Sequence, residues 1–345
     1  MILEENKNKV VTAFGELLMR MHCKHNKRFE QVNEFEVSYS GAEANVAVLL
    51  ARLGIPSRFI TRLPVNDIAR SALDNLRRNN VDTNSILHGG DRMGIYFTEE
   101  GNMLRPSQVI YDRQYSSFAS VNTGTYDWNK IFSDTAWFHW SGICPALSQG
   151  VADVCKEALL MAKQKQITVS ADFNYRSKLW KYGVHPSAIM PELLSYCDVI
   201  TGDIDTAKIY FGIEPIATTD HEESFMHCAK SLQEKLPYMK TFAMSFRGTN
   251  AHHQLMYRGA LMHEGKYFYS TSYLIPQVVD RLGTGDAFNA GLIYSLHQHA
   301  EPQQVIDFAT ACGVLKHSVS GDFAILSKEE IIQFIQTGPN SRVIR

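Results

Sequence analysis

The sequence alternates short apolar runs with amphipathic stretches of helical length, and this alternation is the strongest constraint on the fold. The predicted strands span residues 10–14, 57–63, 137–140, 167–171, 199–201 and 241–245. The predicted helices span residues 42–53, a segment capped by Asn66, and residues 151–165, 186–195, 206–211, 222–234, 287–297, 302–316 and 328–337. Strands that alternate with helices form a mainly parallel sheet covered on both faces. We therefore predict a three-layer α/β/α fold with a mostly parallel central sheet.

Two stretches depart from this alternation. Residues 92–99 and 107–116 alternate in polarity around Gly101 and Pro106, with no helix between them. Together with residues 34–38 they predict antiparallel strands that stand off the main sheet. Such a small β sheet is suited to cover a ligand as a lid. An extension of the sheet edge explains the same pattern equally well.

Length and composition favour one large domain. The 345 residues, 45% of them hydrophobic, allow two domains of about 150 residues or one α/β domain with insertions. No repeat or clear linker divides the chain. We predict a single α/β domain over residues 1–345, with lid strands inserted at roughly 15–39 and 91–118.

Charge and sequence patterns exclude several classes of function. A net charge of −2 gives no reason to expect nucleic acid or a membrane surface as a partner. No apolar run reaches the roughly 18 residues of a membrane helix, and residues 1–9 lack the apolar core of a signal peptide. The six scattered cysteines indicate free thiols in a reducing cytoplasm. The P-loop pattern GxxxxGK[ST] is absent.

The most informative motif is the segment from Gly283 to Asp286, which opens a predicted helix. The backbone N–H groups around Gly283, Thr284 and Gly285 can converge on an anion, and the helix dipole adds positive potential there. A carboxylate beside an anion site is useful when it takes a proton from a hydroxyl that attacks the anion. The alternative is a glycine turn in which Asp286 caps the helix.

A second motif surrounds Gly41. This glycine precedes the predicted helix 42–53 and would let a ligand approach the backbone, and Asn45 lies one turn later on the same side. Most glycines that precede a helix have a purely structural role, so this segment alone is weak evidence for a ligand site.

These residues resemble a known family. Residues 40–54 are similar to the first signature of the ribokinase-like (PfkB) sugar kinases, and residues 280–293 to the second. The resemblance covers nearly the whole chain. Several stretches resemble the 2-dehydro-3-deoxygluconate (KDG) kinases in particular: residues 94–97, 109–113, 141–147, 172–176, 280–281 and 315–323.

The resemblance implies ATP-dependent phosphorylation of a terminal hydroxyl of a sugar acid, KDG to its 6-phosphate. A ribokinase-like kinase for another sugar, or a catalytically weakened homologue that binds a sugar acid, are the alternatives. Carried over by position, Asp286 is the base, and Gly283, Thr284 and Gly285 form the anion hole. The implied substrate contacts are Gly41, Asn45, Tyr96, Tyr111, Arg113, Ile143, Arg176 and Asp322, and the implied nucleotide contacts are Arg247, Gly248, Gly283 and Gly285.

Two of the implied substrate contacts are arginines, whose positive charge suits the carboxylate of the implied substrate. A keto-deoxy acid carries a carboxylate, which a neutral hexose lacks. Arg113 and Arg176 come from different segments and could form charge-assisted bonds to it. Without the resemblance, each arginine would be read as a solvated surface charge.

Several positions depart from the family pattern. The family's Asn-x-x-Glu, linked to Mg²⁺, is replaced here by Asp203 through Thr206, so Asp203 and Asp205 are weak metal candidates that would bind through water. The alternative is that both acids favour the start of the next helix. Ser40, Pro64 and Thr284 also differ from the usual residues, and residues 247–250 form a shorter loop on the nucleotide side.

The exposed edges of the lid strands suggest a homodimer joined through the lid. The expected small-molecule partners are a sugar acid and ATP with Mg²⁺, and the expected location is the cytoplasm.

Overall fold

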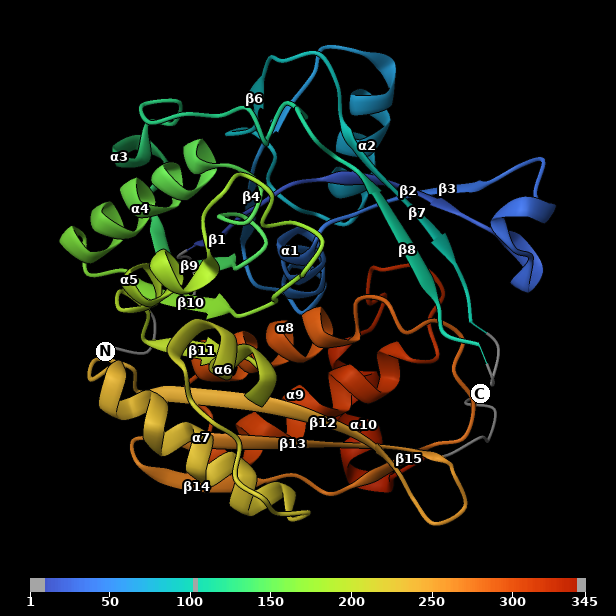
Figure 1. The fold of residues 1–345 in the computed structure, drawn as a ribbon, viewed down its shortest axis with the longest axis vertical. Helices are drawn as coiled ribbons and strands as arrows, with labels where there is room; N and C mark the ends of the chain where they lie inside the picture. Colours follow the sequence, from blue (N-terminus) through green and yellow to red (C-terminus); the bar gives the residue numbers. More distant parts are fainter. Residues whose placement is uncertain (1–9, 102–104, 340–345) are drawn as a thin grey trace.

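The computed structural model describes residues 10–101 and 105–339, and a nine-stranded sheet forms its centre (Figure 1). Its strands are β1 (Val10–Phe14), β4 (Ser57–Ile60), β9 (Thr135–Ser141), β10 (Thr168–Asp172), β11 (Val199–Thr201), β12 (Thr241–Thr249), β13 (Leu255–His263), β14 (Lys266–Tyr269) and β15 (Tyr273–Ile275). The spatial order is β14-β13-β12-β11-β10-β9-β1-β4, and β15 pairs with β13. The six strands from β12 to β4 are mutually parallel, as the alternation predicts.

Helices cover both faces of this sheet and give the predicted three layers. One face packs against α1 (Ala42–Arg52), α8 (Thr284–His297), α9 (Pro302–Lys316) and α10 (Lys328–Thr337). The other face packs against α4 (Gln149–Gln164), α5 (Met190–Leu194), α6 (Ile204–Phe211) and α7 (His221–Lys235), with the short α3 (Trp128–Ile131) beside them. The helix α2 (Asp67–Arg78) lies over a smaller core next to β4.

Local signals set several helix ends as predicted. The Asn66 side chain accepts a hydrogen bond from the Ala69 N–H and caps α2, and Gly212 closes α6 in the left-handed conformation. The predicted helix 186–195 is instead split into a 3₁₀ turn, η3 (Pro186–Ala188), and α5. Pro191 explains the break, because its missing N–H is tolerated only in the first turn of a new helix.

Two further predictions about the sheet need correction. The predicted strand 57–63 is interrupted after β4, and β5 (Arg62–Leu63) pairs instead with β6 (Leu87–His88) in a separate two-stranded sheet. The sequence pattern predicts only helices after residue 245, yet this part of the chain also contains β13, β14 and β15. These antiparallel strands are joined by tight turns such as the one at Gly265, whose φ is +77°. Residues 247–249 therefore continue β12 rather than forming a loop.

A second sheet, of four strands, lies where the lid is predicted, and this sheet is called the lid below. Its strands are β2 (Leu18–His22), β3 (Glu36–Ser40), β7 (Gly94–Glu99) and β8 (Gln108–Asp112), in the order β3-β2-β7-β8, with two short 3₁₀ turns, η1 (Lys24–Asn26) and η2 (Phe29–Gln31), between β2 and β3. Figure 1 shows these strands extending away from the central sheet past α1. The sheet is not wholly antiparallel as predicted, because β2, which the sequence pattern did not reveal, inserts between β3 and β7 and runs parallel to β7.

The structure also bears on two predictions from composition. All six cysteines are buried and unpaired, in agreement with free thiols. Within residues 10–101 and 105–339, no helix is both long and apolar enough to span a membrane. The prediction that residues 1–9 lack a signal core lies outside the described residues.

Phe14, at the end of β1, packs among aromatic rings of the main core, and its substitution measures how much this packing stabilises the fold. Its ring is fully buried and contacts Phe118, Tyr126 and Trp128 at centroid distances of 5.1, 5.4 and 5.3 Å. We expect Phe14→Ala to lower the free energy of unfolding by about 3 to 5 kcal/mol, because it leaves a cavity among rings that cannot all shift. Urea denaturation measures this loss.

The matched control is Tyr115→Ala, since the Tyr115 side chain is 79% exposed. That change is expected to alter stability by less than about 0.5 kcal/mol. Equal losses for the two variants would contradict the packing argument.

Candidate functional site

The parallel strands converge on a cavity at their carboxyl ends. This cavity has a volume of about 320 Å³, and its wall includes Asp172 at the end of β10, Asp203 after β11, Arg247 on β12, and Gly285 and Asn289 on α8. Ligands of open α/β sheets bind in the crevice outside the carboxyl ends of the strands. The topology therefore places the candidate site where the sequence motifs meet.

Asp286 lies in the first turn of α8, close to this cavity. Gly283 precedes the helix with φ +78°, and a Cβ atom there would lie 2.1 Å from the backbone oxygen of Asp322. Only glycine fits that conformation and that contact. A Cβ on Gly285 would meet no atom within 4 Å, so its surroundings are open. The motif thus combines a tightly held turn with an accessible helix N-terminus, where N–H groups attract anions.

A residue far away in the sequence binds the Asp286 carboxylate. The Asn45 Nδ2 of α1 donates a hydrogen bond of 2.6 Å to Asp286 Oδ2. Asn45 itself is buried. The two sequence motifs, 241 residues apart, are therefore brought into direct contact.

The pKa of Asp286 is raised to about 7. Burial is the main cause, the charges of Asp172 and Glu43 add to it, and the bond from Asn45 and the charge of Arg176 oppose it. A carboxyl group with a pKa near neutrality is suited to accept a proton at neutral pH.

Asp172 is a second half-buried acid whose charge acts on Asp286. The pKa of Asp172 is also raised to about 7, mainly by burial and in part by Asp203, while Arg176 lowers it. The Asn289 Nδ2 donates a hydrogen bond of 2.9 Å to Asp172 Oδ2. Asp172 and Asn289 were not assigned roles from the sequence, although the stretch 172–176 was part of the resemblance.

The first motif contributes a close backbone contact as well. The backbone of Gly41 is extended, and a Cβ atom there would lie 2.2 Å from the Glu16 carbonyl oxygen. The space that a side chain would fill is thus occupied by the protein's own backbone. The contact that this glycine permits here is with Glu16, and its role as a ligand contact stays a prediction.

The two arginines predicted to hold a carboxylate differ in their surroundings. Arg113 is buried and forms an ion pair with Glu16, with Nη2 2.5 Å from Oε2. Arg176 is exposed at the rim of the cavity, and its Nη1 donates to the Tyr175 carbonyl oxygen at 3.0 Å. In the described part of the chain Arg176 has no carboxylate within ion-pair distance. Arg176 is therefore the more available of the two for an anionic ligand.

The remaining predicted substrate contacts surround the base of the lid. Tyr96 of β7 donates a hydrogen bond of 2.5 Å from its hydroxyl to Asp322 Oδ2. The ring of Tyr111 lies 6.4 Å from that of Tyr96 and beneath the Arg113 guanidinium. Ile143, half-buried after β9, donates its N–H to Ser141 Oγ. Glu43, fully buried in α1, also accepts from Ser141, and burial raises its pKa.

On the nucleotide side, Thr284 links two segments. Its Oγ1 accepts a hydrogen bond of 2.7 Å from Arg247 Nη2 and donates one of 3.0 Å to the Arg281 carbonyl oxygen. The side chain is buried, and its backbone lies outside the left-handed region. Thr284 thus anchors Arg247 beside the turn instead of obstructing it. Gly248 follows Arg247 within β12.

The acids considered for a metal have local roles. Asp203 caps α6, accepting from the Thr206 N–H at 2.8 Å and from the Thr206 hydroxyl at 2.7 Å, and Asp205 is exposed in the first turn. No group of three or more His, Cys, Asp and Glu side chains among residues 10–101 and 105–339 is arranged to hold a metal ion. Asp172 and Asp203 nevertheless bring two carboxylates to one cavity, which suits Mg²⁺ bound through water and ligand phosphates.

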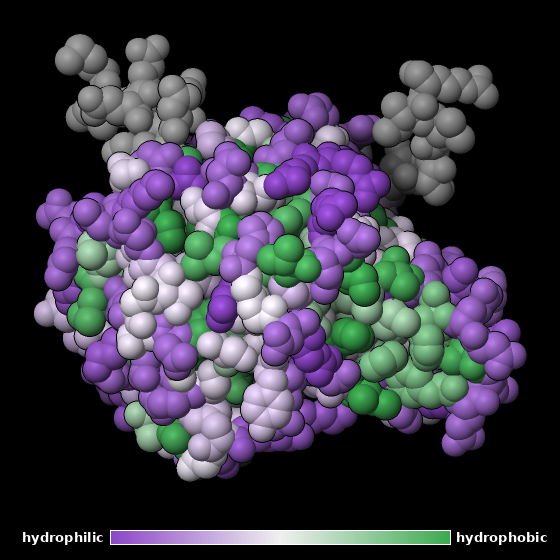
Figure 2. All heavy atoms as spheres, turned by 90° about the horizontal axis from the view of Figure 1, so that it is seen from above, coloured by the Kyte–Doolittle hydropathy of each residue, from purple (hydrophilic) through white to green (hydrophobic). Residues whose placement is uncertain are grey.

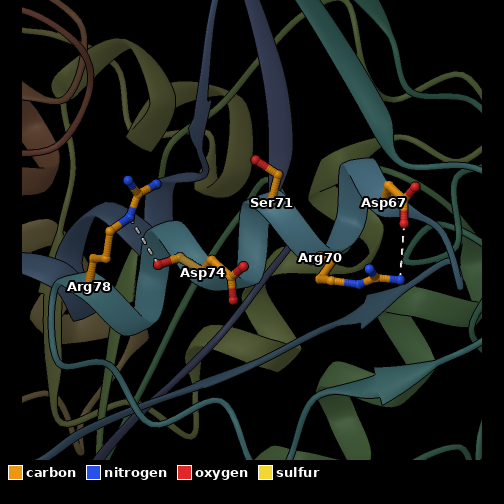
Figure 3. A pocket seen from close by; sticks show the side chains of 5 residues that line it. All are labelled: Asp67, Arg70, Ser71, Asp74 and Arg78. Atoms are coloured by element: carbon orange, nitrogen blue, oxygen red, sulfur yellow. Dashed lines mark hydrogen bonds and ion pairs between the residues drawn. The ribbon is translucent and has the colours of Figure 1, made fainter.

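A second depression, of about 450 Å³, lies elsewhere, on the outer face of α2. Figure 3 shows that its five side chains, from Asp67 to Arg78, all come from this one helix. Asp67 and Arg70 are both exposed and pair with each other at 3.0 Å. This is a solvated helix surface whose charges compensate one another, and no chemistry points to it.

Three comparisons with known proteins bear on the site. A profile of the pfkB family of carbohydrate kinases matches residues 8–328. A 2-dehydro-3-deoxygalactonokinase from Haloferax volcanii is 29% identical over 330 residues, which cover 95% of this chain and 97% of the relative. The crystal structure of a 2-dehydro-3-deoxygluconokinase from Thermotoga maritima is 35% identical, with a TM-score of 0.90 and coverage of 95% and 99%. A protein described as ribokinase II from E. coli, solved with ATP and Mg²⁺, shares the fold at 20% identity, with a TM-score of 0.77 and coverage of 95% and 99%.

The Asn45–Asp286 contact predicts a measurable shift in acidity. Because Asn45 donates to the ionised carboxylate, Asn45→Ala removes a bond that favours the charged form, and the pKa of Asp286 is expected to rise above about 7. Carbon-13 NMR of labelled aspartate carboxyls across a pH titration measures this, with Asp286→Asn assigning the resonance. An unchanged or lower pKa in the Asn45→Ala variant would refute the arrangement.

Proposed function

This chain belongs to the pfkB family of carbohydrate kinases and is a sugar kinase, as its motifs predicted, and we propose that its acceptor is a 2-dehydro-3-deoxy sugar acid. The favoured substrate is 2-dehydro-3-deoxy-D-gluconate, phosphorylated by ATP at its terminal 6-hydroxyl. The observation that carries the proposal is that a half-buried base, Asp286, directly follows Gly285 in the wall of the cavity that an available guanidinium, Arg176, also lines. A neutral sugar would require no such cation.

Asp286 is the proposed general base. With its pKa near 7 it is partly ionised at neutral pH, and the bond from Asn45 fixes one carboxylate oxygen. It would take the hydroxyl proton while the hydroxyl oxygen bonds to the γ-phosphorus. The bond from that phosphorus to the bridging oxygen breaks, and ADP leaves. Matched proton affinity of this kind contributes about 10² to 10⁴-fold to a rate.

The turn from Gly283 to Gly285 is the proposed anion hole. Its N–H groups open α8, whose dipole favours negative charge at that end. Arg247 and Gly248 are the proposed nucleotide contacts, and Thr284 holds the Arg247 guanidinium next to the turn. Donors that are already oriented need no reorganisation when charge develops on the transferring group.

The substrate contacts are proposed along both sides of this centre. Arg176 would form a charge-assisted bond to the acid, and Asn45 and Ile143 would line the acceptor. Tyr96, Tyr111 and Asp322 belong to the base of the lid, where they would orient the sugar hydroxyls. Arg113 and Gly41 would act there through Glu16, with which both are in contact.

Mg²⁺ is the proposed metal, held by Asp203 together with Asp172 through water. When bound, it would neutralise negative charge on the nucleotide phosphates. Two carboxylates at one cavity supply the negative charge that such an ion needs.

We also propose a cytoplasmic homodimer joined through the lid. Val37 on β3 and Ile110 on β8 are 49% and 50% exposed, and each belongs to an edge strand of the four-stranded sheet. Figure 2 shows hydrophobic side chains gathered over the projecting side of the molecule where the lid lies. A second lid sheet would cover both these side chains and the strand edges.

The first test concerns turnover and substrate. ADP release is expected with KDG and to be much weaker with fructose or ribose. Asp286→Asn is expected to lower kcat about 10² to 10⁴-fold, because the amide cannot accept the proton. The parent should also lose kcat/KM as pH falls through about 7, since protonated Asp286 is inactive.

Phosphorus NMR of the product identifies the phosphorylated hydroxyl, and calorimetry checks that Asp286→Asn still binds KDG. An Asp286→Asn variant as fast as the parent would refute the mechanism. Binding of KDG to the parent without ADP release would favour the catalytically weakened homologue instead.

The second test concerns the acid group. Arg176→Met is expected to raise the KM for KDG at least about tenfold, because a charge-assisted bond worth about 1.5 to 3 kcal/mol is lost. Its KM for ATP should remain close to that of the parent. Steady-state kinetics measures both constants, and Arg70→Met, on the outer face of α2, is the control. Equal KM values for KDG in the Arg176→Met variant and the parent would argue against a carboxylate at this position.

A further inference from the structure

We propose that Arg20, on the lid strand β2, is a positioning residue that couples the lid to the turn in front of α8. This inference rests on the proposed function, because it concerns the same reaction. Arg20 is 2% exposed, and no sequence motif pointed to it. It belongs to none of the segments that carry the resemblance.

One nitrogen of this guanidinium bridges two carboxylates. Arg20 Nη1 lies 2.9 Å from Asp280 Oδ2 and 2.5 Å from Asp322 Oδ1. The other nitrogens are held by the lid itself, with Nε donating to Thr98 Oγ1 at 3.1 Å and Nη2 lying 3.3 Å from His22 Nδ1. The side chain is therefore fixed on the lid and points its remaining donors at the body of the protein.

Asp280 extends the network towards the anion hole. Its Oδ1 accepts a hydrogen bond of 2.9 Å from the Leu282 N–H, directly before Gly283, and its Oδ2 accepts one of 3.1 Å from the Gly321 N–H. The Asp322 backbone in turn fills the space next to Gly283. The Asp280 carboxylate and the Asp322 backbone thus both contact the turn that presents the N–H groups.

Asp322 extends the network towards the substrate. Its Oδ2 accepts the Tyr96 hydroxyl at 2.5 Å, and the same hydroxyl lies 2.6 Å from Ser40 Oγ. Burial and the charge of Asp322 keep the pKa of Tyr96 well above its ordinary value, so this hydroxyl remains a donor. The strands β2 and β7 therefore bind this buried carboxylate directly, and β3 is linked to it through Tyr96.

Chemistry explains why an arginine suits this position. A planar guanidinium offers five donors in a fixed fork, whereas a lysine ammonium is a single point with a shorter reach. Removing Arg20 would leave two buried carboxylates facing each other without a cation, and they would move apart or take up protons. The lid contact Tyr96 and the turn at Gly283 would then no longer be positioned by one group.

The experiment compares Arg20→Lys with Asp280→Asn in steady-state kinetics. Lysine keeps the charge but cannot serve both carboxylates together with Thr98, so Arg20→Lys is expected to raise the sugar KM and lower kcat, reducing kcat/KM about a hundredfold, as misplacement by about 1 Å does. Asp280→Asn weakens the arm that leads to the turn and leaves the Arg20–Asp322–Tyr96 contacts in place. It is expected to lower kcat at least about tenfold while the sugar KM stays within about twofold.

The matched control is another arginine that lies between two carboxylates, away from the lid. Arg58 also pairs with two carboxylates, at 2.8 Å from Asp82 and 2.7 Å from Asp134, on the far side of β4. Arg58→Lys is expected to lower the melting temperature without changing kcat or KM. All rates are normalised to the native fraction measured by near-ultraviolet circular dichroism.

The double variant Arg20→Lys/Asp280→Asn completes the cycle. Coupling predicts that its kcat is no lower than that of Arg20→Lys, because both changes break the same connection. Multiplicative losses in kcat would overturn the proposal. So would an Arg20→Lys variant that loses thermal stability but keeps the parent's kcat and KM in its native fraction.

The experiment distinguishes a wrong substrate from a wrong coupling, and it still decides if Arg20→Lys does not fold. Ratios of variant to parent are taken with whichever sugar the parent phosphorylates, so absence of activity on KDG refutes the substrate and leaves the coupling measurable. If Arg20→Lys yields no native protein, Asp280→Asn decides, and an unchanged kcat in that variant overturns the inference.

Discussion

The candidate site depends on burying several carboxylates at the joint between the lid and the start of α8. Burial is the main reason why the pKa values of Asp172 and Asp286 are raised to about 7, and neighbouring carboxylates add to both shifts. Asn45 and Asn289 each donate one bond to these acids and so limit the shift. Buried groups that face one another in this way are costly for stability and are typical of sites arranged for chemistry.

The lid is tied to the rest of the protein by charge rather than by continuous strand pairing. Its four strands form a sheet separate from the central one. Two buried arginines provide the ties, Arg113 with Glu16 and Arg20 with Asp280 and Asp322. Arg20 directs one nitrogen at two carboxylates, and Arg113 directs two nitrogens at one Glu16 oxygen, so each ion pair depends on how its segments are placed. The lid and the turn before α8 are therefore expected to move as one unit.

The departures from the family pattern have physical explanations in the tertiary structure. Thr284 uses its extra hydroxyl to bind Arg247 and the Arg281 carbonyl, so the larger side chain lies buried against its neighbours. Asp203 keeps a carboxylate at the cavity while it caps α6 through both backbone and hydroxyl of Thr206. Neither substitution fills the space beside Gly285, which remains open. These observations favour a working kinase over a homologue that only binds.

The sequence by itself determined the parallel core, most helix ends, the family, and the motif at Gly283–Asp286, because periodicity, caps and glycine turns are local signals. It did not reveal β2, the strands between 255 and 275, or the split of the helix at Pro191, since short antiparallel strands have weak patterns of their own. Only the tertiary structure decided that Asn45 binds Asp286, that Glu16 already neutralises Arg113, and that Arg20 bridges Asp280 and Asp322. The partners in these contacts lie about a hundred or more residues apart, and no local pattern encodes which buried charges will meet.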